Sequence, residues 1–188
     1  MIILFLLFGL RGIIPIDLPK IEKVHWHTIT KEEVYEVALK VSEPTIYSAT
    51  TITLLRHEQG KRKVFLYFPD FNAAGLHPWK KTKYWGWKKE DFQILPIGYF
   101  LWKEGATGQY AVFLAFPDFT SMFQTVLSIV KRKNITNSYT YYRLWVGYKN
   151  GKISQTFDKE KMEHYYNLTK LYLEKKNQKR LKDGRRIS

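Results

Sequence analysis

The segment from Ser42 to Glu58 constrains the fold more than any other part of this sequence. Its middle is almost entirely apolar, apart from hydroxyl side chains that can bond to a helix backbone. We therefore expect a buried central helix, with Ser42 as its N-cap and Pro44 in its first turn. Gly60 can take the left-handed conformation that ends a helix. A lone carboxylate, that of Glu58, then stands at the end of a buried helix.

The other patterns predict an α+β fold that is mainly helical. Thr30 and Glu33 form a capping box before a helix that should end near Val41. Apolar residues alternate on both sides of residues 104–108 and predict a β-hairpin over residues 94–116. Three further helices are predicted. The first begins at Asp118 or Thr120, the second covers Tyr139–Tyr148, and the third covers Asp158–Arg180.

The chain divides into three parts: residues 1–29, a single domain over residues 30–157, and a basic helix and tail over residues 158–188. The first ten residues are apolar, but a bilayer span needs about 20. We expect residues 1–14 to dock or to form an oligomer contact, and a signal peptide or membrane anchor is the alternative. Phe-Pro-Asp-Phe occurs at residues 68–71 and 116–119, which we interpret as a turn used twice.

Composition limits the chemistry and the partners. The net charge of +14 implies an anionic partner, such as nucleic acid, membrane headgroups or an acidic cell-wall polymer. Part of the excess lies between Lys170 and Arg186, where a charge run is most simply a solvated helix end. Cysteine is absent, which excludes disulfides and thiolate chemistry. His25 and His27 lack further ligands at metal-binding spacing, so we expect no metal and no cofactor.

Glu58 is the residue best placed for chemistry. Cleavage of a glycosidic bond needs a carboxylic acid with a raised pKa, held where water is scarce. The end of a buried helix meets that requirement. The loop that follows carries tryptophans that could stack on sugars or simply fill the core; they are Trp79, Trp85 and Trp87. The ordinary alternative is that Glu58 is a solvated residue at a helix end.

The order of these segments resembles the lysozyme-like superfamily over roughly residues 30–150. It is most similar to the glucosaminidase and lytic transglycosylase types, including those carried by phage particles. The signals are Glu58-Gln59-Gly60 at the helix end, an Asn72-x-x-Gly75 loop, the hairpin, and Phe113-Leu114-Ala115-Phe116 before the next helix. The resemblance implies a helical domain with a small β-hairpin lobe beside a cleft, and it implies that Glu58 is the general acid.

The resemblance also implies which other residues meet the substrate. Asn72 and Gly75 would line the floor of the cleft, and a tyrosine from the later tyrosine-rich helix would reach into it. That tyrosine is one of Tyr139, Tyr141, Tyr142 and Tyr148. The expected substrate-binding residues are Asn72, Gly75, Trp85, Trp87, Glu104, Tyr139 and Tyr142.

One feature departs from the family pattern. Many glucosaminidases carry a second carboxylate in the first hairpin strand, and here that position falls near Tyr99 or Phe100. Glu104 at the hairpin tip, or Asp91 before the hairpin, could substitute. Without a second acid the alternatives are the transglycosylase mode, assistance by a neighbouring acetamido group of the substrate, or an inactive domain.

We therefore predict an enzyme that cleaves the glycan strands of peptidoglycan, located in the cell envelope, secreted, or carried on a virion. Its partner would be peptidoglycan or another acidic wall polymer. Two alternatives remain. One is a non-enzymatic structural component of a phage or envelope assembly with a degenerate lysozyme-like fold. The other is a basic nucleic-acid-binding protein, which no recognisable motif supports.

Overall fold

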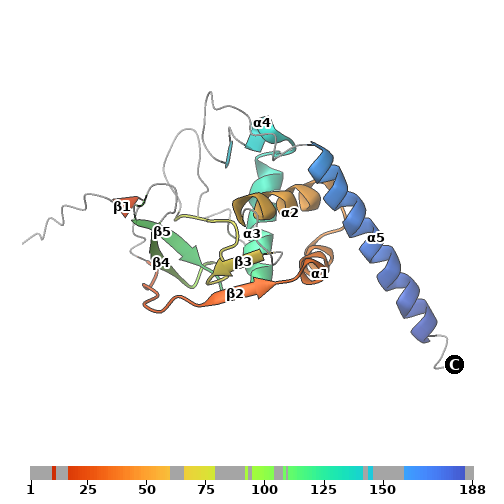
Figure 1. Cartoon of the computed structure of the whole chain (residues 1–188), viewed down its shortest axis with the longest axis horizontal. Helices are drawn as coiled ribbons and strands as arrows, with labels where there is room; N and C mark the ends of the chain where they lie inside the picture. The colour runs from red at the N-terminus through yellow and green to blue at the C-terminus, as the bar shows by residue number, and fades with distance from the viewer. Residues whose placement is uncertain are drawn as a thin grey trace, which may run out of the picture.

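Helix α2 (Ile46–Gln59) lies at the centre of the fold, with the other long helices around it (Figure 1). Every residue from Ser48 to Leu55 is buried, so this helix is covered on all sides. Helices α3 (Phe119–Arg132) and α5 (Lys159–Gly184) pack against α2, and α1 (Lys31–Val41) packs against α3 and α5. The expected buried central helix is therefore confirmed.

This computed structural model describes residues 10–11, 17–59, 66–78, 92, 95–103, 108, 110–141, 144–145 and 159–184. Within these ranges, helices and two small sheets together form an α+β fold, as expected. None of the helices in the described part of the chain has both the length and the apolar character needed to cross a membrane.

The larger sheet contains the predicted hairpin. Strands β4 (Gly98–Lys103) and β5 (Tyr110–Ala115) pair antiparallel, with Gly98 opposite Ala115 and Lys103 opposite Tyr110. Strand β1 (Leu10–Arg11) pairs parallel with β5 on its other side, which gives the strand order β1-β5-β4. The predicted hairpin is confirmed, and four residues of its tip, 104–107, lie outside the described residues.

The smaller sheet fixes the position of β3 (Leu66–Pro69), the first described segment after α2. Strand β2 (Trp26–Ile29) pairs antiparallel with β3. The loop after β3 then docks on β5, because the Leu114 amide donates to the Leu76 carbonyl oxygen at 2.9 Å. The two sheets and α2 are thereby connected through residues 70–78.

The polar residues of α2 use their hydroxyl groups inside the protein. The Thr51 hydroxyl donates to the Tyr47 carbonyl oxygen at 2.8 Å, and the Thr53 hydroxyl donates to the Ala49 carbonyl oxygen at 2.9 Å. These bonds satisfy buried hydroxyls without a partner from another element, as expected. An otherwise apolar helix therefore stays buried although it contains four threonine and serine side chains in its buried stretch, namely Ser48, Thr50, Thr51 and Thr53.

The boundary between the first two helices differs from the prediction. The capping box of Thr30 and Glu33 at the start of α1 is confirmed. Ser42, however, is the C-cap of α1, and its backbone N–H donates to the Ala38 carbonyl oxygen. Helix α2 begins later, at Ile46, after the connection that contains Pro44. Ser42 does have the extended backbone of a cap residue, but it ends the preceding helix instead of starting the next one.

The two Phe-Pro-Asp-Phe segments do not form the same turn, so that interpretation was wrong. Asp118 has an extended backbone and caps the start of α3, accepting a hydrogen bond from the Ser121 amide. Asp70 and Phe71 instead have positive φ angles of 40° and 54°. The first segment must turn the chain into the 72–76 loop, whereas the second must start a helix.

The C-terminal half follows the predicted order of helices. Helix α3 begins after Asp118, and α5 covers the predicted basic helix and extends to Gly184. The aromatic helix expected over 139–148 is seen as α4 (Ser138–Tyr141) and a helical turn at residues 144–145. The rest of that segment, and the apolar residues 1–9, lie outside the described residues.

Replacing Thr30 with Ala should lower the free energy of unfolding by about 1 kcal/mol, because the first turn of α1 loses the side-chain oxygen that accepts from the Glu33 amide. Chemical denaturation of the two proteins measures this difference. Thr30→Ser keeps the capping oxygen and should remain close to the wild type. A loss of the same size in Thr30→Ser would contradict the capping role.

Candidate functional site

Glu58 lies in the last turn of α2, next to aromatic side chains from α4 and the turn after it. The Tyr141 hydroxyl donates a hydrogen bond to Oε1 of Glu58. Trp145 also forms a side-chain hydrogen bond with this carboxylate. The ring of Tyr141 is almost completely buried, at 1% exposed, so the hydroxyl is held in place by its surroundings. Two hydrogen-bond donors, Tyr141 and Trp145, thus orient the carboxylate.

The carboxylate of Glu58 has a pKa raised to about 7, because the surrounding protein desolvates it. The hydrogen bonds from Tyr141 and Trp145 act in the opposite direction, because they favour the charged form. Glu58 as a whole residue is nevertheless exposed, although protein atoms crowd its carboxylate. An acid with this pKa is about half protonated at neutral pH.

Gly75 faces the other oxygen of the carboxylate. It has a φ of +62°, in the left-handed region that glycine adopts without steric cost. A Cβ atom at this position would lie 4.0 Å from Oε2 of Glu58. The glycine therefore brings bare backbone close to Oε2, whereas Tyr141 bonds to Oε1.

Asn72 holds the Gly75 loop in place from inside the protein. Its side-chain amide donates to the carbonyl oxygens of Leu76 and Leu114, both at 2.8 Å, and its oxygen accepts from the Leu76 amide at 2.8 Å. We expected Asn72 to contact substrate on the cleft floor. That expectation needs correction, because the side chain is only 3% exposed and its amide is engaged with backbone. Asn72 acts by positioning Gly75.

Gln59 connects the same loop directly to α2. Its side-chain amide donates to the Ala73 carbonyl oxygen at 2.8 Å. The residue that follows Glu58 in sequence therefore bonds to the residue two positions before Gly75. The loop and the helix end are thereby held together, and the spacing between Glu58 and Gly75 does not depend on the α2 backbone alone.

His57 packs beside the site but does not act on Glu58 directly. Its ring lies edge-on to the ring of Tyr141, with 5.2 Å between the ring centroids. Burial lowers the pKa of His57, and the charge of Lys161 lowers it further. The lowered pKa favours the neutral imidazole, and the ring packs against Tyr141 beside the site.

The tyrosine that meets Glu58 is Tyr141, and the expected Tyr139 does not take this position. Tyr139 is 56% exposed and lies two residues earlier in a helix, where side chains point to nearly opposite sides. Trp145 was not among the expected site residues. Its four-residue spacing from Tyr141, which places both rings on one helix face, was the available signal. The other expected binding residues lie outside the described residues; they are Trp85, Trp87, Glu104 and Tyr142.

Within the described ranges, the groups that set the pKa of Glu58 include no second carboxylate. Positions Tyr99 and Phe100 of β4 carry none, and Asp91 lies outside the description. Among the same residues, no group of three histidine or acidic side chains is arranged to hold a metal ion. Among the described residues, Glu58 is the group at this site whose pKa suits it to donate and accept a proton near neutral pH.

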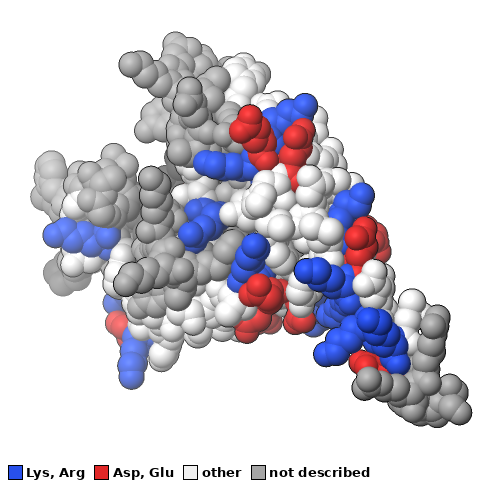
Figure 2. Space-filling view, turned by 45° about the vertical axis from the view of Figure 1, so that its right-hand side comes forward, with Lys and Arg blue, Asp and Glu red and all other residues white. Residues whose placement is uncertain are grey.

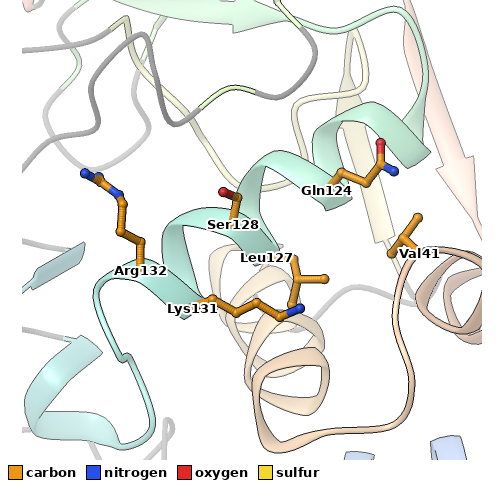
Figure 3. Close-up of a pocket in the computed structure, with 6 residues that line it drawn as sticks. All are labelled: Val41, Gln124, Leu127, Ser128, Lys131 and Arg132. Atoms are coloured by element: carbon orange, nitrogen blue, oxygen red, sulfur yellow. The ribbon is translucent and has the colours of Figure 1, made fainter.

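A hollow of about 290 Å³ lies at a different place, between α3 and the end of α1 (Figure 3). It shares no residue with the site around Glu58 and contains no carboxylate. Two of its lining side chains are cationic, and both come from the last turn of α3. The lining residues are Val41, Gln124, Leu127, Ser128, Lys131 and Arg132.

Tyr141→Phe should raise the pKa of Glu58 further, because the variant loses a hydrogen bond that favours the ionised carboxylate. NMR titration of the ¹³C-labelled glutamate side chain measures the change. Tyr139→Phe is the matched control, since it removes a hydroxyl from an exposed tyrosine of the same helix, and it should leave the titration unchanged. Identical titrations for wild type and Tyr141→Phe would show that the hydroxyl does not act on Glu58.

Comparison of this chain with protein-family models, with curated proteins and with solved structures found no match.

Proposed function

We propose that this protein cleaves the glycan strands of peptidoglycan, with Glu58 as the general acid. The observation that carries the proposal is a carboxyl group with a pKa of about 7, on an exposed residue at the end of a buried helix. A general acid works best when its pKa lies near the working pH, because it is then both protonated and able to release the proton.

The proposed first step is transfer of the Glu58 proton to the oxygen of the glycosidic bond. The bond between that oxygen and the anomeric carbon breaks, and the sugar that carries the anomeric carbon develops positive charge. Glu58 becomes a carboxylate, which the hydrogen bonds from Tyr141 and Trp145 favour. Gly75 places no side chain beside Oε2, and the leaving oxygen is proposed to approach there.

The second step returns the proton to Glu58. In hydrolysis, the carboxylate takes a proton from water as its oxygen bonds to the anomeric carbon. In the transglycosylase mode, a hydroxyl of the same sugar takes the place of water and an anhydro sugar forms. The described surroundings of Glu58 include no second acid, which favours a mechanism in which the substrate's own hydroxyl or acetamido group assists.

A lysozyme-like domain over residues 30–157 is part of this proposal. Its support is the order of elements: α2 with Glu58 at its end, the loop with Asn72 and Gly75, the β4–β5 hairpin, and α3 behind it. The net charge of +14 adds support for an acidic target, such as a cell wall. Location in the cell envelope, outside the cell or on a virion would follow from such a substrate.

Lytic activity should fall as the pH rises through about 7, because only the protonated form of Glu58 can donate a proton. Clearing of purified cell walls, followed by turbidity across pH, gives the profile. The alkaline limb of Tyr141→Phe should lie at higher pH than that of the wild type. A limb near pH 4.5 would mean that the reacting group is an ordinary carboxyl.

Glu58→Gln should lower the rate of clearing by about 100-fold or more, because it removes the transferable proton at nearly constant shape. Glu43→Gln removes an exposed carboxylate outside α2 and should clear walls at the wild-type rate. Equal clearing by wild type and Glu58→Gln would exclude Glu58 as the acid. Clearing by neither protein would favour the non-enzymatic structural component.

A further inference from the structure

One row of residues along α5 is apolar in the first half of the helix and basic in the second half. Its residues follow one another at spacings of three and four, so they lie on a single face. The first half packs against the hydrophobic core and consists of Tyr165, Leu168 and Tyr172. The second half continues at the same spacing with three exposed lysines, which we name the basic stripe: Lys175, Lys179 and Lys182.

The change occurs where α5 leaves the body of the protein. The Tyr172 hydroxyl donates to Oε1 of Glu36 on α1 at 2.8 Å, and Nζ of Lys176 lies 3.6 Å from the same oxygen. Beyond this contact the end of α5 projects away from the other elements (Figure 1). Residues 177–184 add about 12 Å of helix at 1.5 Å per residue.

The basic stripe continues the face of α5 that packs against the hydrophobic core in the first half of the helix. Figure 2 shows lysine and arginine side chains gathered along this end of the helix. Like charges at spacings of three and four residues repel one another, so their alignment costs stability in the free protein. A polyanion that lay along the stripe would remove that repulsion and release its own counterions.

We propose that the basic stripe binds a flexible linear polyanion without bases, of the kind that the polyol-phosphate polymers of cell walls represent. This inference rests on the proposed wall-degrading function, since it names what the wall offers besides the glycan. Lysine ammonium groups act as point charges that suit phosphates spaced along a flexible chain. Such an attachment would raise the local concentration of glycan at the enzyme.

The geometry favours this partner over nucleic acid. Binding of single strands relies on aromatic rings that stack with bases. The last aromatic residue of the stripe, Tyr172, already donates its hydroxyl to Glu36 and packs against the core.

The geometry also disfavours insertion into a lipid surface. A helix that lies in a membrane buries a broad apolar face. The exposed large hydrophobic residues in the described part of α5 are Leu171 and Leu181, and these two leucines do not form such a face. The binding energy must therefore come mainly from charge, which predicts a strong dependence on salt.

The experiment measures binding of the full chain to fluorescently labelled poly(glycerol phosphate) by anisotropy, over a range of salt concentrations. The test variant carries Lys175→Gln, Lys179→Gln and Lys182→Gln. The control variant removes three exposed lysines elsewhere and therefore has the same net charge: Lys23→Gln, Lys103→Gln and Lys131→Gln. Circular dichroism verifies that both variants keep their helices.

The test variant should bind about tenfold or more weakly, and the slope of log K against log salt should fall by roughly two. The control variant should stay within about threefold of the wild type, because its lysines are not aligned on α5. Equal weakening of both variants would overturn the proposal in favour of net charge alone. Absence of salt-sensitive binding by the wild type would also overturn it.

Two competing probes identify the partner class. Tighter binding to an oligo-dT of matched charge would assign the stripe to nucleic acid, and tighter binding to vesicles of 30% phosphatidylglycerol in phosphatidylcholine would assign it to membranes; either result overturns the proposal. Glu58→Gln should bind the polymer like the wild type. Polymer binding without wall clearing would thus contradict only the catalytic role of Glu58, and clearing without polymer binding would contradict only the stripe.

Discussion

The burial of α2 is the constraint on which the rest of the structure depends. Ile52, Leu54 and Leu55 are completely buried, and burial of such side chains contributes about 1.5–3 kcal/mol each relative to exposure. Helices α3 and α5 pack directly against α2, and α1 packs against α3 and α5. The last turn of α2 therefore has a well-defined position. Glu58 lies in this turn, where the surrounding protein desolvates its carboxylate and raises its pKa.

The site is then completed by elements that have no direct connection in sequence. Asn72 and Gln59 hold a loop so that bare backbone at Gly75 lies on one side of the carboxylate. Tyr141, more than eighty residues after Glu58, donates its hydroxyl to the other carboxylate oxygen, Oε1. The two carboxylate oxygens therefore have different surroundings, since Oε1 accepts a hydrogen bond and Oε2 lies near the bare backbone of Gly75.

Local signals in the sequence were sufficient for most of the elements. The capping box at Thr30, the alternation in the hairpin and the amphipathic α3 with Asp118 as N-cap all depend on residues within a few positions of each other. Prediction failed where the same local motif has two uses. Ser42 suits either end of a helix, and Phe-Pro-Asp-Phe adopts a left-handed turn at Asp70 but a cap at Asp118.

By itself, the sequence determined the α+β class, the buried central helix and the position of one carboxylate at its end, because hydrophobic periodicity and capping are local properties. Only the tertiary structure decided that Tyr141 and not Tyr139 meets Glu58, that Trp145 joins it, and that Asn72 works from the interior. These outcomes depend on how separate elements pack. The raised pKa is likewise a tertiary property, because desolvation comes from atoms that distant parts of the chain bring to the carboxylate.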